Sequence, residues 1–234
     1  DIKGKTHGLP VYEMLGGLMR DRIWCYGRWD GTNPESAVEN AMSYIDQGVT
    51  ALKGDPFHHR GHLITYEAEK LAIEIFQAVR EAVGYEVELL VEVHGRLTPS
   101  AAIRIGNEIE HLRPFVYEEP VPFQNMDAMK RVADAVNIPI ATGERLYTKW
   151  DYADLLKRQI VAMIQPDVIQ GGGISELKKI AAMAEAEYVG FQPHAIHGPK
   201  DVLAALHLDA STPNFMIHEG GMKAWFQDAF IGDF

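Results

Sequence analysis

Three glutamates recur at one interval in this chain of 234 residues. Glu92, Glu118 and Glu144 are 26 residues apart, and each stands at or beside the C-terminal end of a short apolar run. That interval fits one strand, one helix and two loops, so the three carboxylates are predicted to lie at the same height on neighbouring parallel strands. Carboxylates that converge in this way repel one another unless a cation lies between them. All-oxygen ligation suits a hard divalent ion, which predicts magnesium rather than zinc.

The alternative interpretation gives each glutamate an ion pair with a nearby lysine or arginine. A single glutamate favours that alternative, whereas three glutamates in one register favour a metal site. Zinc motifs such as CxxC and HExxH are absent from the sequence. We therefore predict one Mg²⁺ held by the three glutamates.

The same recurrence continues with other polar groups. Asp167, His194 and Glu219 each follow an apolar run, at steps of 23, 27 and 25 residues. On adjacent strands a carboxylate can fix the tautomer of an imidazole and raise its basicity, so Asp167 and His194 are predicted to form a general-base pair. A serine hydrolase also needs such a pair, but no GxSxG motif occurs. The alternative for His194 is a buried histidine with a purely structural role.

The elements that must position these groups are apolar runs alternating with segments of helical period. Strands are predicted at 23–26, 49–53, 87–93, 115–118, 138–142, 161–165, 188–192 and 215–218. Helices are predicted near 9–17, 35–47, 65–83, 99–112, 126–136, 149–158, 174–187 and 199–210. Asn33-Pro34, Thr98-Pro99 and Ser175 are expected helix starts.

Eight strands alternating with helices predict an α/β fold of the TIM-type barrel class. An open doubly wound sheet shows the same alternation, but its polar groups gather at one switch point, whereas here strands three to eight all end in them. The length suits one catalytic domain. We expect a helical lead-in over 1–22, the barrel over 23–221 and the start of a C-terminal return segment over 222–234.

The charge balance restricts the class of partner. With 22 basic and 33 acidic side chains the net charge is -11, which argues against nucleic acid and against an acidic membrane surface. A small anionic substrate then requires a metal or local cations in the site. A lone cysteine, Cys25, cannot form an intramolecular disulfide, and no long apolar run or signal sequence is present, so a cytoplasmic location is expected.

Several segments resemble the enolase superfamily. They are VEVHGR (91–96), VYEEPVP (116–122), TGERLYTKWDY (142–152), QPDVIQGGGISELKKIAAMAEA (165–186) and QPHAIHGP (192–199). Within that superfamily they are similar to the mandelate racemase and muconate lactonizing enzyme subgroup, and there to sugar-acid dehydratases of the galactonate type. The resemblance covers nearly the whole chain. It implies a modified (β/α)7β barrel, an N-terminal capping domain that these residues do not include, and a homo-oligomer.

The resemblance also implies a reaction in which a 2,3-dihydroxy acid loses water to give a 2-keto-3-deoxy acid. The roles implied are metal ligation by Glu92, Glu118 and Glu144, proton abstraction by His194 with Asp167, carboxylate binding by Glu219, and acid catalysis by His94. Superfamily sites pair a lysine or histidine base with magnesium, which stabilises the enediolate.

Two residues depart from the subgroup pattern. Glu92 stands where an aspartate is usual, and its extra methylene shifts the carboxylate by about one bond length. The segment Lys53-Gly54-Asp55 replaces a Lys-x-Lys motif whose second lysine acts as an opposing base in racemases. Its absence favours one-base elimination over racemisation. The further candidates for substrate contact are Lys53, Asp55, Arg96, Tyr147 and His197, with a salt bridge as the alternative for Lys53.

Two other functions stay open on the sequence. One is an epimerase, racemase or cycloisomerase of the same superfamily. The other is a non-catalytic homologue that binds sugar acids, an interpretation that depends on Glu92. The expected partner is a small-molecule sugar-acid substrate.

Overall fold

The computed structural model describes residues 1–58 and 61–220. The chain divides into two compact units. The β1–β5 unit comprises residues 26–142 and 158–162, and the β6–β7 unit comprises residues 1–25, 143–157 and those from 163 onward. The C-terminal return segment expected over 222–234 lies outside the described residues.

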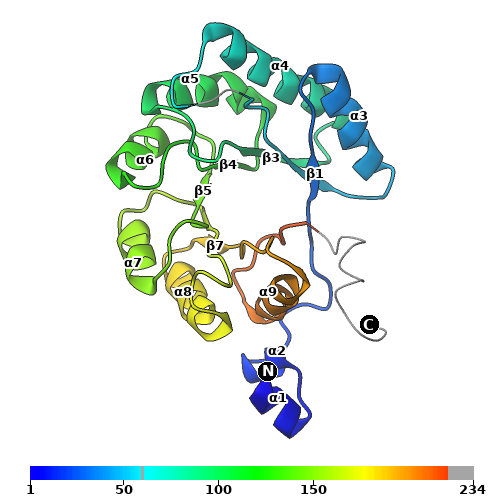
Figure 1. Cartoon of the computed structure of the whole chain (residues 1–234), viewed down its shortest axis with the longest axis vertical. Coiled ribbons are helices and arrows are strands. Elements are labelled where there is room, and N and C mark those ends of the chain that lie inside the picture. The colour runs from blue at the N-terminus through cyan, green and yellow to red at the C-terminus, as the bar shows by residue number, and fades with distance from the viewer. Residues whose placement is uncertain (59–60, 221–234) are drawn as a thin grey trace. The chain divides into compact units, whose positions relative to one another are not determined.

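The β1–β5 unit is a parallel sheet whose strands neighbour one another in chain order. Its strands are β1 Gly27–Trp29, β2 Ala51–Gly54, β3 Glu88–Glu92, β4 Val116–Glu118 and β5 Ile140–Thr142. Its helices are α3 Pro34–Ile45, α4 Tyr66–Val83, α5 Pro99–Ile109, the 3-10 helix η1 Glu110–Leu112 and α6 Met126–Ala133. Consecutive α-helices from α3 to α6 pack against one another, as Figure 1 shows.

Strand register sets which side chains share a face in this unit. Lys53 pairs with Leu90, and Glu92 pairs with Glu118. Because side chains alternate along a strand, Leu90 and Glu92 point to the same face, and Lys53 shares it. The lysine therefore begins two residues, roughly 6.6 Å, below the level of the two glutamates.

The core of the unit explains why its strands read as unbroken apolar runs. Leu89, Leu90 and Val91 of β3 are all fully buried, as expected for a parallel strand covered on both faces. Helix α4 buries Ala72, Ile75, Phe76 and Val79, the spacing of one helical face.

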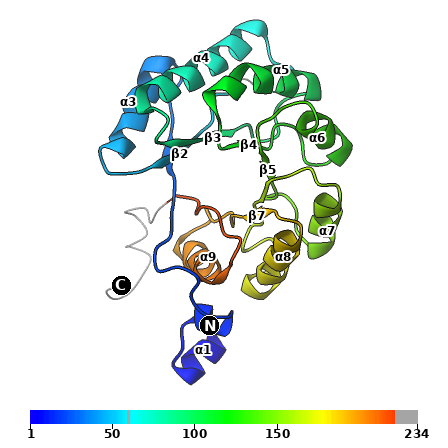
Figure 2. The same cartoon turned by 180° about the vertical axis from the view of Figure 1, so that it is seen from behind.

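The β6–β7 unit contains a shorter pair of parallel strands and five helices among its described residues. Its elements are α1 Ile2–His7, α2 Val11–Met14, α7 Lys149–Lys157, β6 Met163–Ile164, α8 Ile174–Ala186, β7 Gly190–Phe191 and α9 Pro199–Ser211. Helices α7, α8 and α9 pack in succession beside β7, as Figure 2 shows. The register of β6 with β7 continues beyond the strands to a parallel bridge between Asp167 and His194.

Local signals predicted most helix starts and some strand positions. Asn33 and Thr98 cap α3 and α5 through their side chains, as predicted. The start at Ser175 is wrong, since α8 begins at Ile174 after Gly173 in a left-handed conformation. The first strand lies at 27–29 rather than 23–26, and the run 215–218 forms isolated bridges rather than a strand. None of the described helices has the length and apolarity that crossing a membrane requires.

Candidate active site

Asp167 and His194 meet at the carboxyl ends of β6 and β7. Their backbones form a parallel bridge, and His194 Nδ1 lies 2.7 Å from Asp167 Oδ2. Asp167 is fully buried and His194 nearly so. An oxygen at that distance requires a proton on Nδ1, which leaves Nε2 as the atom available for chemistry.

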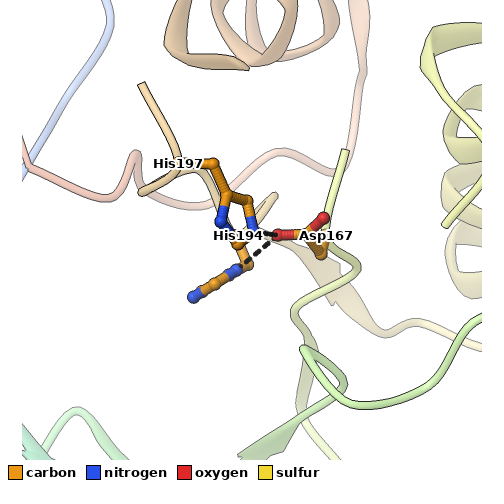
Figure 3. A group of neighbouring side chains, drawn as sticks. All are labelled: Asp167, His194 and His197. Carbon is orange, nitrogen blue, oxygen red and sulfur yellow. Dashed lines mark hydrogen bonds and ion pairs between the residues drawn. The ribbon is translucent and has the colours of Figure 1, made fainter. Parts of the chain in front are cut away.

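A second imidazole binds the same carboxylate oxygen. His197 Nε2 lies 2.8 Å from Asp167 Oδ2, and both rings converge on that oxygen in Figure 3. His197 therefore carries its proton on Nε2. The three side chains offer ligand atoms within 4.8 Å of one another, a set that suits a transition metal as well as a hydrogen-bonded cluster.

Backbone amides complete the environment of Asp167. Its Oδ1 accepts hydrogen bonds from the N–H groups of Ile169 (2.9 Å) and Gln170 (2.7 Å). Burial acts to raise the pKa of Asp167, but the hydrogen bonds from His194 and Gln170 and the charges of the two histidines outweigh it and lower the pKa. Asp167 is thus held as an oriented acceptor rather than as an acid.

Two glutamates lie near the other nitrogen of His194. Its Nε2 is 3.2 Å from Glu144 Oε2 and 3.8 Å from Glu219 Oε2. Burial acts to lower the pKa of His194, but the bond to Asp167 and the charges of Glu219 and Glu144 raise it to about 9. Glu219 also accepts a hydrogen bond from the N–H of Ala195 at 3.4 Å.

Glu92 and Glu118 lie side by side in the β1–β5 unit with a lysine between them. Lys53 Nζ is 3.3 Å from Glu92 Oε2 and 2.9 Å and 3.1 Å from the two oxygens of Glu118. All three side chains are buried. The long side chain of Lys53 spans the two-residue step that the register imposes, so the structure forms the salt bridge that was the alternative for this residue.

The carboxylate oxygens of Glu92 and Glu118 are of the chemical type that binds a magnesium ion. Glu92 and Glu118 present carboxylate oxygens from adjacent strands at one level, and hard oxygens are the ligands that Mg²⁺ prefers. Glu92 Oε1 already accepts the N–H groups of Val93 (2.9 Å) and His94 (2.7 Å). Glu144 belongs to the β6–β7 unit, so a metal site made by all three glutamates stays a prediction.

His94 belongs to a second carboxylate–imidazole pair. Its Nδ1 lies 2.8 Å from Asp55 Oδ2, and Arg96 contacts both oxygens of Asp55. Burial acts to raise the pKa of Asp55, but His94 and Arg96 outweigh it, so the pKa is lowered. Asp55 and Arg96, predicted as substrate contacts, are bound to each other and to the predicted acid.

The remaining candidates are more exposed or were missed. Tyr147 is about half exposed. Arg145 Nη2 lies 3.0 Å from Glu144 Oε1. The sequence interpretation missed the contact of His197 with Asp167, although two histidines three residues apart after one strand were a usable signal.

A buried Asp209–His218 pair was also missed. His218 Nδ1 lies 2.7 Å from Asp209 Oδ2, and both side chains are buried. Burial raises the pKa of Asp209 to about 6 against the opposing effects of His218 and Arg20. No motif marks this contact, because it joins helix α9 to a bridge residue beyond it.

Comparisons with known proteins agree on one family. Residues 36–234 match the family described as "Enolase C-terminal domain-like". The chain is 37% identical over 222 residues to a D-galactonate dehydratase of Verminephrobacter eiseniae (strain EF01-2), covering 95% of this chain and 58% of that protein. It is 35% identical over 249 residues to a D-mannonate dehydratase of Sphingomonas sp. (strain SKA58), covering 94% and 61%.

Solved structures match along nearly the whole chain. A member of the enolase superfamily from Salmonella typhimurium superposes with a TM-score of 0.89 at 38% identity, covering 93% of this chain and 61% of that one. A mandelate racemase/muconate lactonizing enzyme-like protein from Roseovarius sp. TM1035 gives 0.92 at 38%, covering 97% and 61%. The chain therefore spans about three fifths of its relatives' length. These matches confirm the predicted α/β fold of the TIM-barrel type.

Proposed function

Since the chain belongs to the enolase C-terminal domain-like family, we propose that the protein carrying it is a magnesium-dependent sugar-acid dehydratase. The reaction removes the proton α to a carboxylate and eliminates the 3-hydroxyl as water, and the resulting enol becomes a 2-keto-3-deoxy acid. The dehydratase names of the relatives support this reaction class. The observation that carries it is the orientation of His194 by Asp167 at 2.7 Å.

His194 is the proposed base. Asp167 holds Nδ1–H, so the lone pair of neutral Nε2 can accept the α proton. Asp167 stabilises the imidazolium that forms, and its two backbone hydrogen bonds keep it from moving with the proton. The proton taken from carbon is carried on Nε2, from which it can exchange with solvent.

The negative charge that develops on the substrate carboxylate needs stabilisation. A bound Mg²⁺ supplies a Lewis acid for those oxygens, with Glu92, Glu118 and Glu144 as the residues proposed to hold it. Glu219 is the residue proposed to bind one of the carboxylate oxygens. A cation near Glu144 would also lower the pKa of His194, because it offsets one of the charges that raise that pKa.

His94 is the proposed acid. It donates a proton to the 3-hydroxyl as the carbon–oxygen bond breaks, so that water rather than hydroxide leaves. Its position two residues after Glu92, at a left-handed φ of 54°, is the kind of strained backbone found at functional sites.

A panel of aldonates tests the proposal. The protein that contains this chain, loaded with Mg²⁺, is incubated with galactonate, mannonate and their epimers, and 2-keto-3-deoxy acids are assayed. We expect turnover of at least one of these acids. Solvent deuterium at the α carbon without dehydrated product would instead indicate an epimerase, and silence with every acid would refute both readings.

A further inference from the structure

Asp55 is held through both of its carboxylate oxygens. Its Oδ1 accepts the N–H of Phe57 at 3.0 Å, its Oδ2 accepts from His94 Nδ1 at 2.8 Å, and Arg96 contacts both oxygens. The carboxylate therefore has a donor on each side.

Arg96 is itself fixed to the backbone beside the predicted acid. Its Nε donates to the carbonyl oxygen of Val93 at 2.9 Å, while its guanidinium holds Asp55. A single guanidinium nitrogen, Nη2, contacts both oxygens of Asp55, which holds the carboxylate by a charge-assisted contact. The loop that follows β3 thus carries both the imidazole and the group that aims its partner.

The backbone of His94 is fixed by separate contacts. Its N–H donates to Glu92 Oε1 at 2.7 Å, and the following Gly95 donates to the carbonyl of Glu119 at 2.7 Å. Since the backbone is held at a left-handed φ of 54°, the main freedom left to the side chain is rotation of the ring. The bond to Asp55 removes that freedom.

We propose that Asp55 is a positioning residue that accepts a hydrogen bond from Nδ1–H of His94 and so orients the imidazole, so that Nε2–H of the protonated ring faces the departing hydroxyl and can supply its proton. This inference rests on the proposed dehydratase function, and it adds a second carboxylate–imidazole pair to that of Asp167 and His194. The two pairs have different tasks. One orients the base and the other orients the acid.

Removal of the α proton and departure of the hydroxyl can be measured separately. In D2O, His194 can remove the α proton and return a deuteron even when the hydroxyl cannot leave. Asp55→Asn is therefore expected to lower the rate of elimination by at least about tenfold, and by no more than His94→Gln, whose loss of acid catalysis is about 10²–10⁴-fold. Exchange at the α carbon should stay within about threefold in both variants, and the loss should fall on kcat with KM nearly unchanged.

A matched variant controls for the chemical change itself. Asp127→Asn removes the same charge from an exposed aspartate that pairs with Arg158 in the same unit, and it should leave elimination unchanged. Thermal unfolding and circular dichroism establish that each variant is folded. If Asp55→Asn does not fold, Arg96→Lys tests the same alignment with the charge retained.

A second readout is independent of turnover. In protein labelled with ¹⁵N-histidine, at a pH at which the ring is neutral, His94, assigned from its loss in His94→Gln, should carry its proton on Nδ1 in the wild type and show a mixture of tautomers in Asp55→Asn. The inference would be overturned if Asp55→Asn kept the wild-type tautomer of His94 and the wild-type rate of elimination. It would also be overturned if the folded variant lost exchange at the α carbon as much as it lost elimination. If the wild-type protein turns over no acid, the proposed function fails while the tautomer measurement still decides the role of Asp55.

Discussion

Replacing Lys53 with methionine removes the cation from between two buried glutamates. The ammonium lies within 3.3 Å of Glu92 and within 2.9 Å and 3.1 Å of the two oxygens of Glu118, and all three side chains are almost inaccessible to water. Methionine has nearly the same length and packs well, so the substitution deletes the charge with little change in volume.

The expected cost follows from that burial. Removing one partner of a buried ion pair destabilises a protein by about 3–5 kcal/mol, because the remaining charge stays desolvated. For a chain of this size each kcal/mol lowers Tm by about 2–4 °C, which predicts a fall of roughly 6–20 °C. Lys130→Met is the matched control. Its partner Asp134 and Lys130 itself are exposed, and such pairs contribute less than about 1 kcal/mol.

Urea unfolding of the two variants and the wild type, without divalent cations and then with Mg²⁺, measures both effects. If Glu92 and Glu118 are a cation site, Mg²⁺ should stabilise Lys53→Met more than the wild type, since no ammonium then competes with it. At a concentration of one hundred times its Kd, Mg²⁺ should raise the free energy of unfolding of Lys53→Met by about 2.7 kcal/mol. If Lys53→Met lowered the free energy of unfolding by an amount within about 1 kcal/mol of that for Lys130→Met, the reasoning would be refuted.

Three further predictions concern the metal and two titrating groups. Chelation with EDTA should abolish dehydration, and Mg²⁺ should restore it while Ca²⁺, which is larger and accepts looser geometry, restores less. Glu219→Gln should lower the pKa of His194 below about 9 in an NMR titration of the metal-free protein, because it removes a negative charge that raises that pKa; an unchanged titration would contradict the proximity of 3.8 Å. The pKa of Asp209 is about 6 in the folded protein, against an ordinary value of 3.8. Its protonated form therefore stabilises the folded state at low pH, and this stabilisation is lost as the pH rises from about 4 to 6. Asp209→Asn should remove that dependence. The difference in the free energy of unfolding between this variant and the wild type should therefore change by about 3 kcal/mol between pH 4 and pH 7. Asp134→Asn, at the surface, should leave the pH dependence of stability unchanged.

The recurrence of polar residues at strand ends predicted the contacts that depend on backbone register. Glu92 does pair with Glu118, 26 residues on, and Asp167 does pair with His194, 27 residues on. The predicted register of Glu144 is wrong, because Glu118 pairs with Ala141 and Glu144 follows the end of β5. For these two pairs the spacing alone carried the information. His94 follows the end of β3 in a turn at a left-handed φ of 54°, so strand alternation does not place it.

Contacts that depend on side-chain reach were not decided by the sequence, which left the salt bridge of Lys53 as an alternative. Lys53 spans two residue steps to the glutamates, and a sequence pattern does not say whether a flexible side chain turns toward them or toward solvent. Asp55 was a substrate contact in the sequence interpretation, since nothing in the spacing showed that Arg96 and His94 would both bind it. The first strand was placed too early because Trp24 and Cys25 continue its apolar run, while the sheet ladder begins at Gly27.

His194, oriented by Asp167, is the residue proposed to remove the α proton of a sugar acid. The most direct test is the rate at which His194→Asn, in the Mg²⁺-loaded protein, exchanges the α proton of a turned-over aldonate with D2O. We predict that exchange and dehydration are both lost, while Mg²⁺ binding by calorimetry is retained. Exchange at the wild-type rate in the folded, metal-binding variant would contradict the claim and place the base on another residue.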